Sequence, residues 1–201
     1  MQWLSEYGYL IIVFIVLLAA FVFLLIKAAG AYSNHNKAYK AQEAEIRRLT
    51  ALKEKFRNAS AKELDSFPQE EILEGTALLY QIALQKCDNM EAEFEKLSTE
   101  KKYIYVLDVF TQDESVGEFF SQNSELLTGI IIDALDVIGM TDFSSELSIV
   151  AKMFDKDNEE ISFSRVQLEN FDKMMSDKNI LSEIKLNAAK YIKENYDILK
   201  C

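Results

Sequence analysis

The sequence predicts an all-α protein with an N-terminal transmembrane helix, a helical stem and a compact multi-helix cytosolic domain. About half of the 201 residues are hydrophobic, but only six are glycine and one is proline. These few turn residues do not suit a β-sandwich or a barrel. The length suffices for one packed domain with appendages. We therefore expect an anchor in residues 1–30, a stem in 31–59 and a domain in 60–201.

The predicted anchor is an uncharged apolar run, LIIVFIVLLAAFVFLLI, at residues 10–26. At about 1.5 Å per residue, this run and the residues just before it nearly fill a hydrocarbon core of about 30 Å. Trp3, Tyr7 and Tyr9 suit one membrane interface, and Lys27 suits the other. Because basic residues follow the run and none precedes it, we expect the N-terminus outside and the domain in the cytoplasm. The predicted location is an inner or plasma membrane.

A cleaved signal peptide is the alternative interpretation of the same segment. The residues before the apolar run include no lysine or arginine, and the run is longer than the usual core of a signal peptide. No pair of small residues at a spacing of four lies within the run to specify a tight helix dimer. The pattern therefore favours a single-pass anchor.

The stem is predicted to be an amphipathic helix with a basic charge. Ile46, Leu49, Leu52 and Phe56 recur at helical spacing. Residues 27–57 hold eight basic and three acidic residues, whereas residues 60–201 hold fourteen basic and twenty-nine acidic ones, a balance of minus fifteen. A basic stem is attracted to an anionic leaflet that repels the acidic domain, which would hold the domain away from the membrane. The simpler alternative is a positive-inside signal followed by an ordinary acidic domain.

The domain is predicted to begin with a short helix and a long one. Ser60 and Glu63 form a capping box, and Ser66 with Pro68 and two following glutamates marks a second helix start. The apolar stripe of this second helix consists of Ile72, Leu73, Leu79, Tyr80, Ala83, Cys87, Met90 and Phe94. We expect one helix to carry this stripe on a core-facing side.

Two further helices are predicted in the middle of the domain. Residues 103–110, YIYVLDVF, are rich in β-branched and aromatic side chains, but no hairpin partner lies nearby, so we expect a helix capped by Thr99. Asn123 or Ser124 opens the next helix, and Gly139 ends it. Its apolar face consists of Leu127, Ile130, Ile131, Ala134, Leu135 and Ile138.

Three helices are predicted in the C-terminal part of the chain. The first begins at Thr141 or Asp142 and runs to about Phe154; the others cover residues 162–175 and 179–196. The apolar face of the last consists of Ile180, Ile184, Ala188, Tyr191 and Ile192.

Residues 154–171, FDKDNEEISFSRVQLENF, resemble the acidic start of a calcium-binding loop but do not complete one. Such a loop needs glycine at position 6 and a bidentate glutamate at position 12. If Asp155 is position 1, Glu160 takes the glycine position and Val166 takes position 12. Moving the frame back by one residue puts Arg165 there. We therefore predict a polar turn and no metal site.

The sequence predicts no cofactor and no catalytic residue. The only histidine, His35, lies in the stem, so no Ser-His or Cys-His pair forms within the domain. Cys87 and Cys201 are predicted to be free thiols in a reducing cytoplasm. Neither a phosphate-binding glycine loop nor a basic aromatic surface run is present, so we expect no direct contact with nucleic acid.

One enzymatic alternative stays open. Asp108, Asp133 and Asp136 lie in otherwise apolar helices and could converge on one pocket. A hydrolase that uses carboxylates would need such a pocket, with at least one acid of raised pKa.

Residues 103–140 contain an acid-rich turn, a short aromatic segment, an Asn-Ser cap and a helix ending in Ile-Gly. The positions are Asp113, Glu114, Phe119, Phe120, Asn123, Ser124, Ala134, Leu135, Ile138 and Gly139. This pattern resembles a bacterial all-helical family of uncharacterised domains named after an acidic DNA-mimic protein. The resemblance implies a helical fold. It also implies the alternative that the acidic surface imitates a phosphate backbone and sequesters a DNA-binding protein.

The favoured hypothesis is a non-catalytic interaction domain that acts as an adaptor, a regulator or a defence or immunity component. The candidate partner-binding residues are Asp113, Glu114, Glu118, Phe119 and Phe120. An adaptor predicts an exposed apolar groove, lined by the two phenylalanines together with Met174 or Met175. The expected partners are a membrane and an unidentified protein.

Overall fold

The computed structural model describes residues 39–113, 115–123, 125–152, 154, 169, 172–173 and 178–200. The chain forms two compact units, Met1–Thr50 and Ala51–Cys201. The predicted span at residues 10–26, with its interface residues Trp3, Tyr7, Tyr9 and Lys27, lies outside the described residues. Among the helices of the described part, none has the length and apolar character needed to cross a membrane.

In the first unit, the described residues 39–50 are helical, as the stem pattern predicts. Ion pairs along the helix link Arg47 to Glu43 at 2.6 Å and Arg48 to Glu45 at 2.7 Å. Both pairs are largely exposed to solvent, so each adds little to helix stability.

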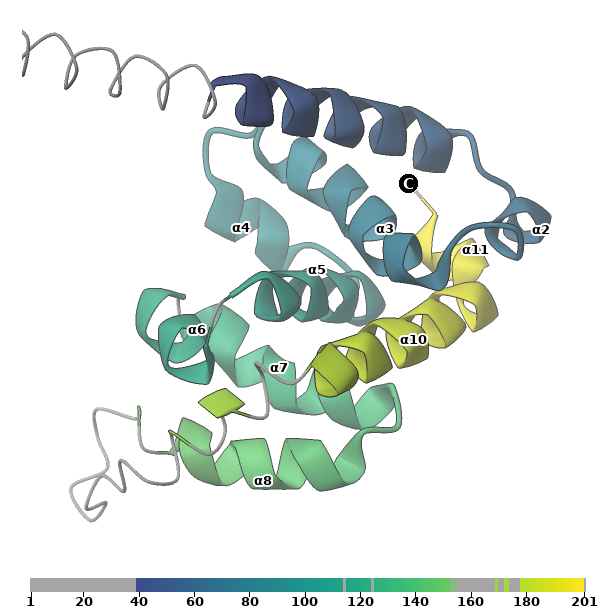
Figure 1. Cartoon of the computed structure of the whole chain (residues 1–201). Helices are drawn as coiled ribbons and strands as arrows, with labels where there is room; N and C mark the ends of the chain where they lie inside the picture. The colour runs from purple at the N-terminus through teal and green to yellow at the C-terminus, as the bar shows by residue number, and fades with distance from the viewer. Residues whose placement is uncertain are drawn as a thin grey trace, which may run out of the picture. The chain divides into compact units, whose positions relative to one another are not determined.

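The second unit contains only helices in its described residues, which confirms the all-α prediction. Residues 51–57 are helical, and Leu52, Phe56 and Ala59 are buried, so the end of the predicted stem contributes to this unit's core. The labelled helices are α2 (Ala61–Leu64), α3 (Gln69–Leu84), α4 (Met90–Glu95), α5 (Thr99–Gln112), α6 (Val116–Gln122), α7 (Glu125–Val137), α8 (Thr141–Ala151), α10 (Lys178–Glu194) and α11 (Tyr196–Leu199) (Figure 1).

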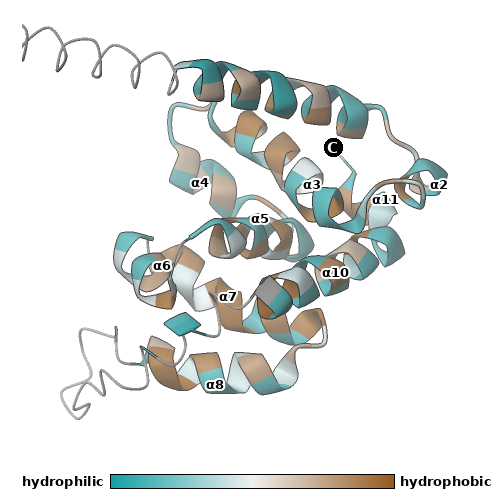
Figure 2. Ribbon diagram, in the orientation of Figure 1, coloured by the Kyte–Doolittle hydropathy of each residue, from teal (hydrophilic) through white to brown (hydrophobic). Residues whose placement is uncertain are grey.

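Helix α5 is at the centre of this unit because it packs against α3, α7 and α10. Helix α7 lies between α5 and α8 (Figure 1). It is mostly hydrophobic along its length, as a helix packed on two sides must be (Figure 2). In the core, the Phe110 ring of α5 meets Phe119 of α6 edge-on at 5.0 Å and Phe143 of α8 at 6.4 Å. Aromatic side chains thus connect α6 and α8 to α5.

Two predicted helix ends are confirmed. The Glu63 carboxylate accepts hydrogen bonds from the backbone N–H and the hydroxyl of Ser60, both at 2.7 Å, and these bonds lower the pKa of Glu63. Helix α7 ends at Val137 and is terminated by Gly139, which has a φ of 85°, and the Met140 N–H donates to the carbonyl of Leu135 at 2.9 Å. This is a Schellman ending, which favours glycine because its φ is positive.

The prediction of one helix carrying the stripe from Ile72 to Phe94 is wrong. Helix α3 ends at Leu84, and a new helix, α4, begins at Met90. The Asn89 side chain accepts a hydrogen bond from the N–H of Ala92 at 3.1 Å and so caps α4. As a result Cys87 and Met90, which the stripe placed in the core, are exposed; Ala83, which still lies within α3, is exposed as well.

Two predicted caps are also wrong. Pro68, not Ser66, occupies the N-cap position of α3, and the Ser66 hydroxyl donates instead to the carbonyl of Glu63. Ser98, not Thr99, caps α5 by accepting from the N–H of Lys101.

Near the C-terminus, the helix predicted at 179–196 appears as α10, followed after Asn195 by α11. The helix predicted at 162–175 lies mostly outside the described residues. One described residue of that region, Asp172, accepts a hydrogen bond from the N–H of Val116 at 3.0 Å, at the start of α6. The described residues contain no cluster of three metal-ligand side chains.

Candidate functional site

The aromatic residues predicted to bind a partner lie in the core. Phe119 is 0% exposed and Phe120 is 8% exposed. The Ser115 hydroxyl caps the start of α6 by accepting from the N–H of Glu118. In this helix the Phe119 ring packs edge-on against Phe110, and the Phe120 ring stacks on Phe154 with 5.3 Å between the ring centres. The expectation that these two residues line an exposed groove is therefore wrong.

The acidic residues of the same prediction stay near the surface. Asp113 accepts a hydrogen bond from the Asn123 amide at 3.2 Å, and partial burial raises the pKa of Asp113. Glu118 accepts from the Gln122 amide at 2.8 Å. Glu114, Met174 and Met175 lie outside the described residues. Among the described residues of this predicted patch, the acids Asp113 and Glu118 lie near the surface, whereas the two phenylalanines are buried.

The three helix acids considered for catalysis are not brought together. Asp133 and Asp136 lie on the exposed face of α7, whereas Asp108 is buried in α5. One Asp108 oxygen, Oδ2, accepts hydrogen bonds from the amides of Gln81 at 3.0 Å and Gln112 at 2.6 Å. The partners of the buried carboxyl are thus two neutral amides.

The protonation of Asp108 is set mainly by burial. Burial raises its pKa to about 7, and the nearby charge of Glu74 acts in the same direction. The Gln81 hydrogen bond and the charge of Lys185 oppose this rise. Asp108 is therefore a core acid that changes charge near neutral pH.

An apolar groove, here called the α4 groove, lies where the chain turns from α3 into α4. Its volume is about 190 Å³. The apolar lining consists of Leu84, Met90, Phe94, Tyr105, Leu126 and Leu127. These residues come from the end of α3, from α4, from α5 and from the start of α7. The side chain of Met90 is 50% exposed, which leaves an apolar surface open to a partner.

The break between α3 and α4 produces this groove. Phe94 is buried and meets the Tyr105 ring edge-on at 5.2 Å, which fastens α4 to α5. Leu126 and Leu127 are only half-buried, because the neighbouring helices do not cover the whole apolar face of α7. The groove is thus an edge of the core that the neighbouring helices leave open.

The charged residue among those that line the α4 groove is acidic. Glu91 lines it, and the same short helix also carries Glu93 and Glu95. Lys96 pairs with Glu93 at 2.6 Å. Burial, together with the charge of Asp108, raises the pKa of the Tyr105 hydroxyl, so this wall stays neutral. An apolar floor with acidic edges suits an amphipathic segment that carries basic residues.

The sequence contained a signal for this groove. Asn89 followed by Met-Glu-Ala-Glu is an N-cap residue with acids in the first helical turn. That pattern predicts a helix start at Met90. The apolar periodicity instead predicts Met90 in a continuous core stripe and Leu127 on the core face of the helix that follows Asn123, so it does not predict an open edge between them.

No protein-family model, curated protein or solved structure matches this chain.

Proposed function

We propose that this is a single-pass membrane protein whose helical domain binds another protein on the cytoplasmic side. In this proposal it is not an enzyme and acts as an adaptor, a regulator or a component of a defence or immunity module. The observation that carries the proposal is the α4 groove, with its half-exposed Met90 above a floor of buried Phe94 and Leu84. Methionine adapts its shape readily, which suits a binding surface.

The proposed partner segment is an amphipathic helix with apolar anchors on one face and lysine or arginine beside them. The apolar anchors would cover Met90, Leu126 and Leu127. The basic residues would face the acidic edge formed by Glu91 and its neighbours on α4. Apolar contact provides most of the affinity in this binding mode, and charge complementarity provides orientation and association rate.

The charge distribution supports a membrane-anchored arrangement. The basic residues 27–57 follow the apolar run at 10–26, while residues 60–201 carry a balance of minus fifteen. An anionic inner leaflet attracts the first segment and repels the second. In the proposed arrangement the acidic domain remains accessible to cytoplasmic partners.

Capture from native membranes tests the proposed site with a matched pair of variants. Met90→Lys places a positive charge in the groove, whereas Ile149→Lys places the same charge on α8, at a side chain of similar exposure (54%). With the full-length protein, we expect Met90→Lys to reduce recovery of a specific partner about tenfold, the effect of about 1.4 kcal/mol. We expect Ile149→Lys to leave recovery unchanged, and wild-type capture to persist in high salt.

Two results would overturn this proposal. Equal recovery with both variants would mean that the groove is not the contact surface. Release of a basic DNA-binding protein by moderate salt, equally from both variants, would favour the acidic surface as the site instead, as a DNA mimic requires.

The exposed Cys87 provides a topology test. In a Cys201→Ser background, a membrane-impermeant thiol reagent should label Cys87 only after the cells are permeabilised. Labelling of intact cells would place the domain outside and contradict the proposed orientation.

A further inference from the structure

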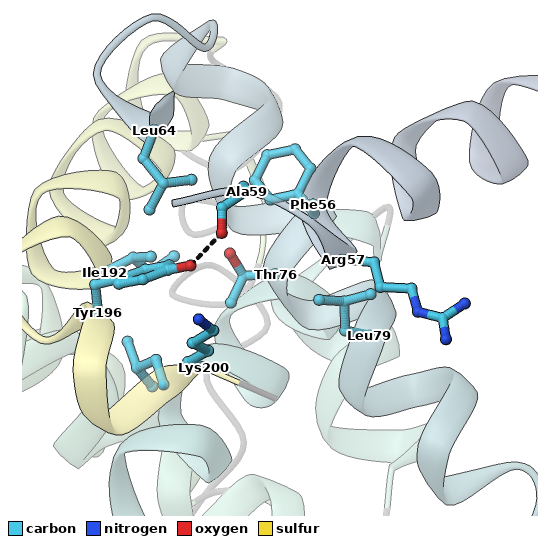
Figure 3. Close-up of a pocket in the computed structure, with 10 residues that line it drawn as sticks. Phe56, Arg57, Ala59, Leu64, Thr76, Leu79, Ile192, Tyr196 and Lys200 are labelled. Carbon is cyan, nitrogen blue, oxygen red and sulfur yellow. Dashed lines mark hydrogen bonds between the residues drawn. The ribbon is translucent and has the colours of Figure 1, made fainter. Parts of the chain in front are cut away.

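A second hollow lies beside the C-terminal helix α11, and we call it the α11 cavity (Figure 3). Its volume is about 220 Å³. The apolar walls are formed by Phe56, Ala59, Leu64, Leu79, Ile192 and Leu199. These residues come from segment 51–59, α2, α3, α10 and α11, so five parts of the unit enclose one space.

The hydroxyl groups at the wall are already satisfied within the protein. Thr76 donates a hydrogen bond to the carbonyl of Ile72 at 2.8 Å, and Tyr196 donates to the carbonyl of Ala59 (Figure 3). The cavity therefore offers little to hold water. An apolar cavity of about 150 Å³ stays dry and accepts benzene, so this larger space can take a ring or a short hydrocarbon chain.

The mouth of the cavity is basic. Arg57 and Lys200 are exposed and belong to the lining, and none of the described lining residues is acidic. The Lys200 side chain points toward Tyr196 and Thr76, whereas the Arg57 guanidinium points away from the other lining residues (Figure 3). Lys200 is thus placed to meet a group that protrudes from the cavity.

The basic mouth contrasts with the composition of the domain. Residues 60–201 hold about twice as many acidic as basic residues, twenty-nine against fourteen. Lys200, the cation of this range that lines the mouth, therefore has no acidic neighbour among the described lining residues of a domain rich in acids. Such a site favours a ligand with an anionic head over a neutral or cationic one.

We propose that the α11 cavity binds a small amphipathic carboxylate. Its hydrocarbon part, a short acyl chain or a ring, fills the space between Leu64, Leu79 and Ile192. Its carboxylate lies at the mouth and pairs with the Lys200 ammonium. This site is separate from the α4 groove, and neither proposal depends on the other.

Methyl-detected NMR of the full-length protein in zwitterionic lipid nanodiscs tests the site with three probes of equal chain length. These are hexanoate, 1-hexanol and hexylamine. Hexanoate should produce saturable shifts at the methyl groups of Leu64, Ile192 and Leu199. Hexanol should bind more weakly, and hexylamine more weakly still. Absence of saturable cavity shifts with hexanoate, or equal affinity for the three probes, would overturn the proposal.

Two variants with matched controls identify the contacts. Lys200→Gln should weaken hexanoate binding about two- to fivefold, the value of a solvent-accessible ion pair, and leave hexanol binding unchanged. Lys190→Gln, an exposed change on α10 away from the lining, should change neither. Leu79→Trp should fill the space and abolish binding of both probes. If that variant does not fold, Lys200→Gln still decides: equal losses of hexanoate and hexanol would overturn the proposal.

Discussion

The α4 groove and the α11 cavity use the same helix, α3, in opposite ways. Leu84, at the end of α3, forms part of an open groove with an acidic edge. Thr76 and Leu79, earlier in α3, line a more enclosed space with a basic mouth. One domain with a strongly negative balance thus presents two hollows of opposite local charge. Net charge alone therefore does not indicate which ligand a surface accepts.

The two hollows also differ in how they are built. The groove exists because α3 stops and Asn89 starts a new helix, which leaves Met90 half-exposed. At the cavity, two tyrosines donate to distant carbonyls: Tyr196, which lines it, donates to Ala59, and Tyr80 donates to the lining residue Leu199. The α4 groove therefore forms at a break between two helices, whereas the α11 cavity forms where hydrogen bonds join segments that are distant in the sequence. The cavity should therefore depend more on global stability.

The largest expected difference between the sites concerns side-chain truncation. Leu64, at the cavity, is 1% exposed, and Leu64→Ala should lower the free energy of unfolding by about 2–5 kcal/mol because it enlarges a buried space. Met90→Ala, in the groove, should change it by about 0.5 kcal/mol or less. Denaturant unfolding of both variants measures the difference, and similar losses would contradict the contrast in burial.

The free energy of unfolding should depend on pH through Asp108, which lies one helical turn beyond the groove residue Tyr105. The raised pKa of Asp108, about 7 against an ordinary 3.8, means that the folded state holds its proton more tightly than the unfolded chain. Stability should therefore fall as pH rises from about 4 to 7, by up to about 4 kcal/mol, and then level off. The neighbouring charges of Glu74 and Lys185 modify this range.

Denaturant unfolding at several pH values measures this dependence. Asp108→Asn should flatten the profile between about pH 4 and 7, because the amide does not ionise. Asp136→Asn, an exposed change on α7, should leave the profile as it is. A profile that Asp108→Asn does not flatten would mean that Asp108 ionises normally in the folded state.

Two helical glycines, Gly75 in α3 and Gly129 in α7, should respond in opposite directions to alanine. A Cβ at Gly75, near the cavity, would lie 2.3 Å from the Phe56 ring, so Gly75→Ala should cost about 1–3 kcal/mol. A Cβ at Gly129, in the groove helix α7, would meet nothing within 4 Å, so Gly129→Ala should stabilise by about 1 kcal/mol. Thermal unfolding of the pair measures both signs, and the same sign for both would contradict the packing at Phe56.

The smallest expected effect concerns the cap that creates the groove. Asn89→Ala removes the acceptor for the Ala92 N–H and should cost about 1 kcal/mol, with faster hydrogen exchange confined to α4. Asn89→Asp retains a carboxylate acceptor and should cost little. If both variants exchange alike, the side chain of Asn89 does not determine where α4 begins.

The sequence predicted the helical class and several helix ends for clear physical reasons. The Ser60 capping box and the stop at Gly139 depend on a few adjacent residues, so local chemistry was sufficient. The break after Leu84 competed with an apolar stripe that continued in phase to Phe94. The cap at Asn89 determines the structure here: α4 begins at Met90, and the continuous helix predicted from the stripe does not form.

The candidate sites were less predictable because they depend on contacts between distant segments. Phe119 and Phe120 are buried because they pack against Phe110 and Phe154, and the local sequence does not predict these contacts. Lys200 and Leu64 come together only through the long-range packing of α11. Contacts between residues so distant in the sequence cannot be predicted from local charge and periodicity, so neither the groove nor the cavity could be identified from the sequence alone.

The most direct test of the central claim uses one methyl NMR experiment with two probes of equal length and opposite charge. In the full-length protein in nanodiscs, hexanoate should shift the cavity methyls of Ile192 and Leu199 and spare those of the groove. Hexylammonium, the charged form of hexylamine, should shift the groove methyls of Leu126 and Leu127 at lower concentration than those of the cavity. If both probes shift the same methyl groups, or if their preferences are reversed, the two hollows are not sites of opposite charge selectivity.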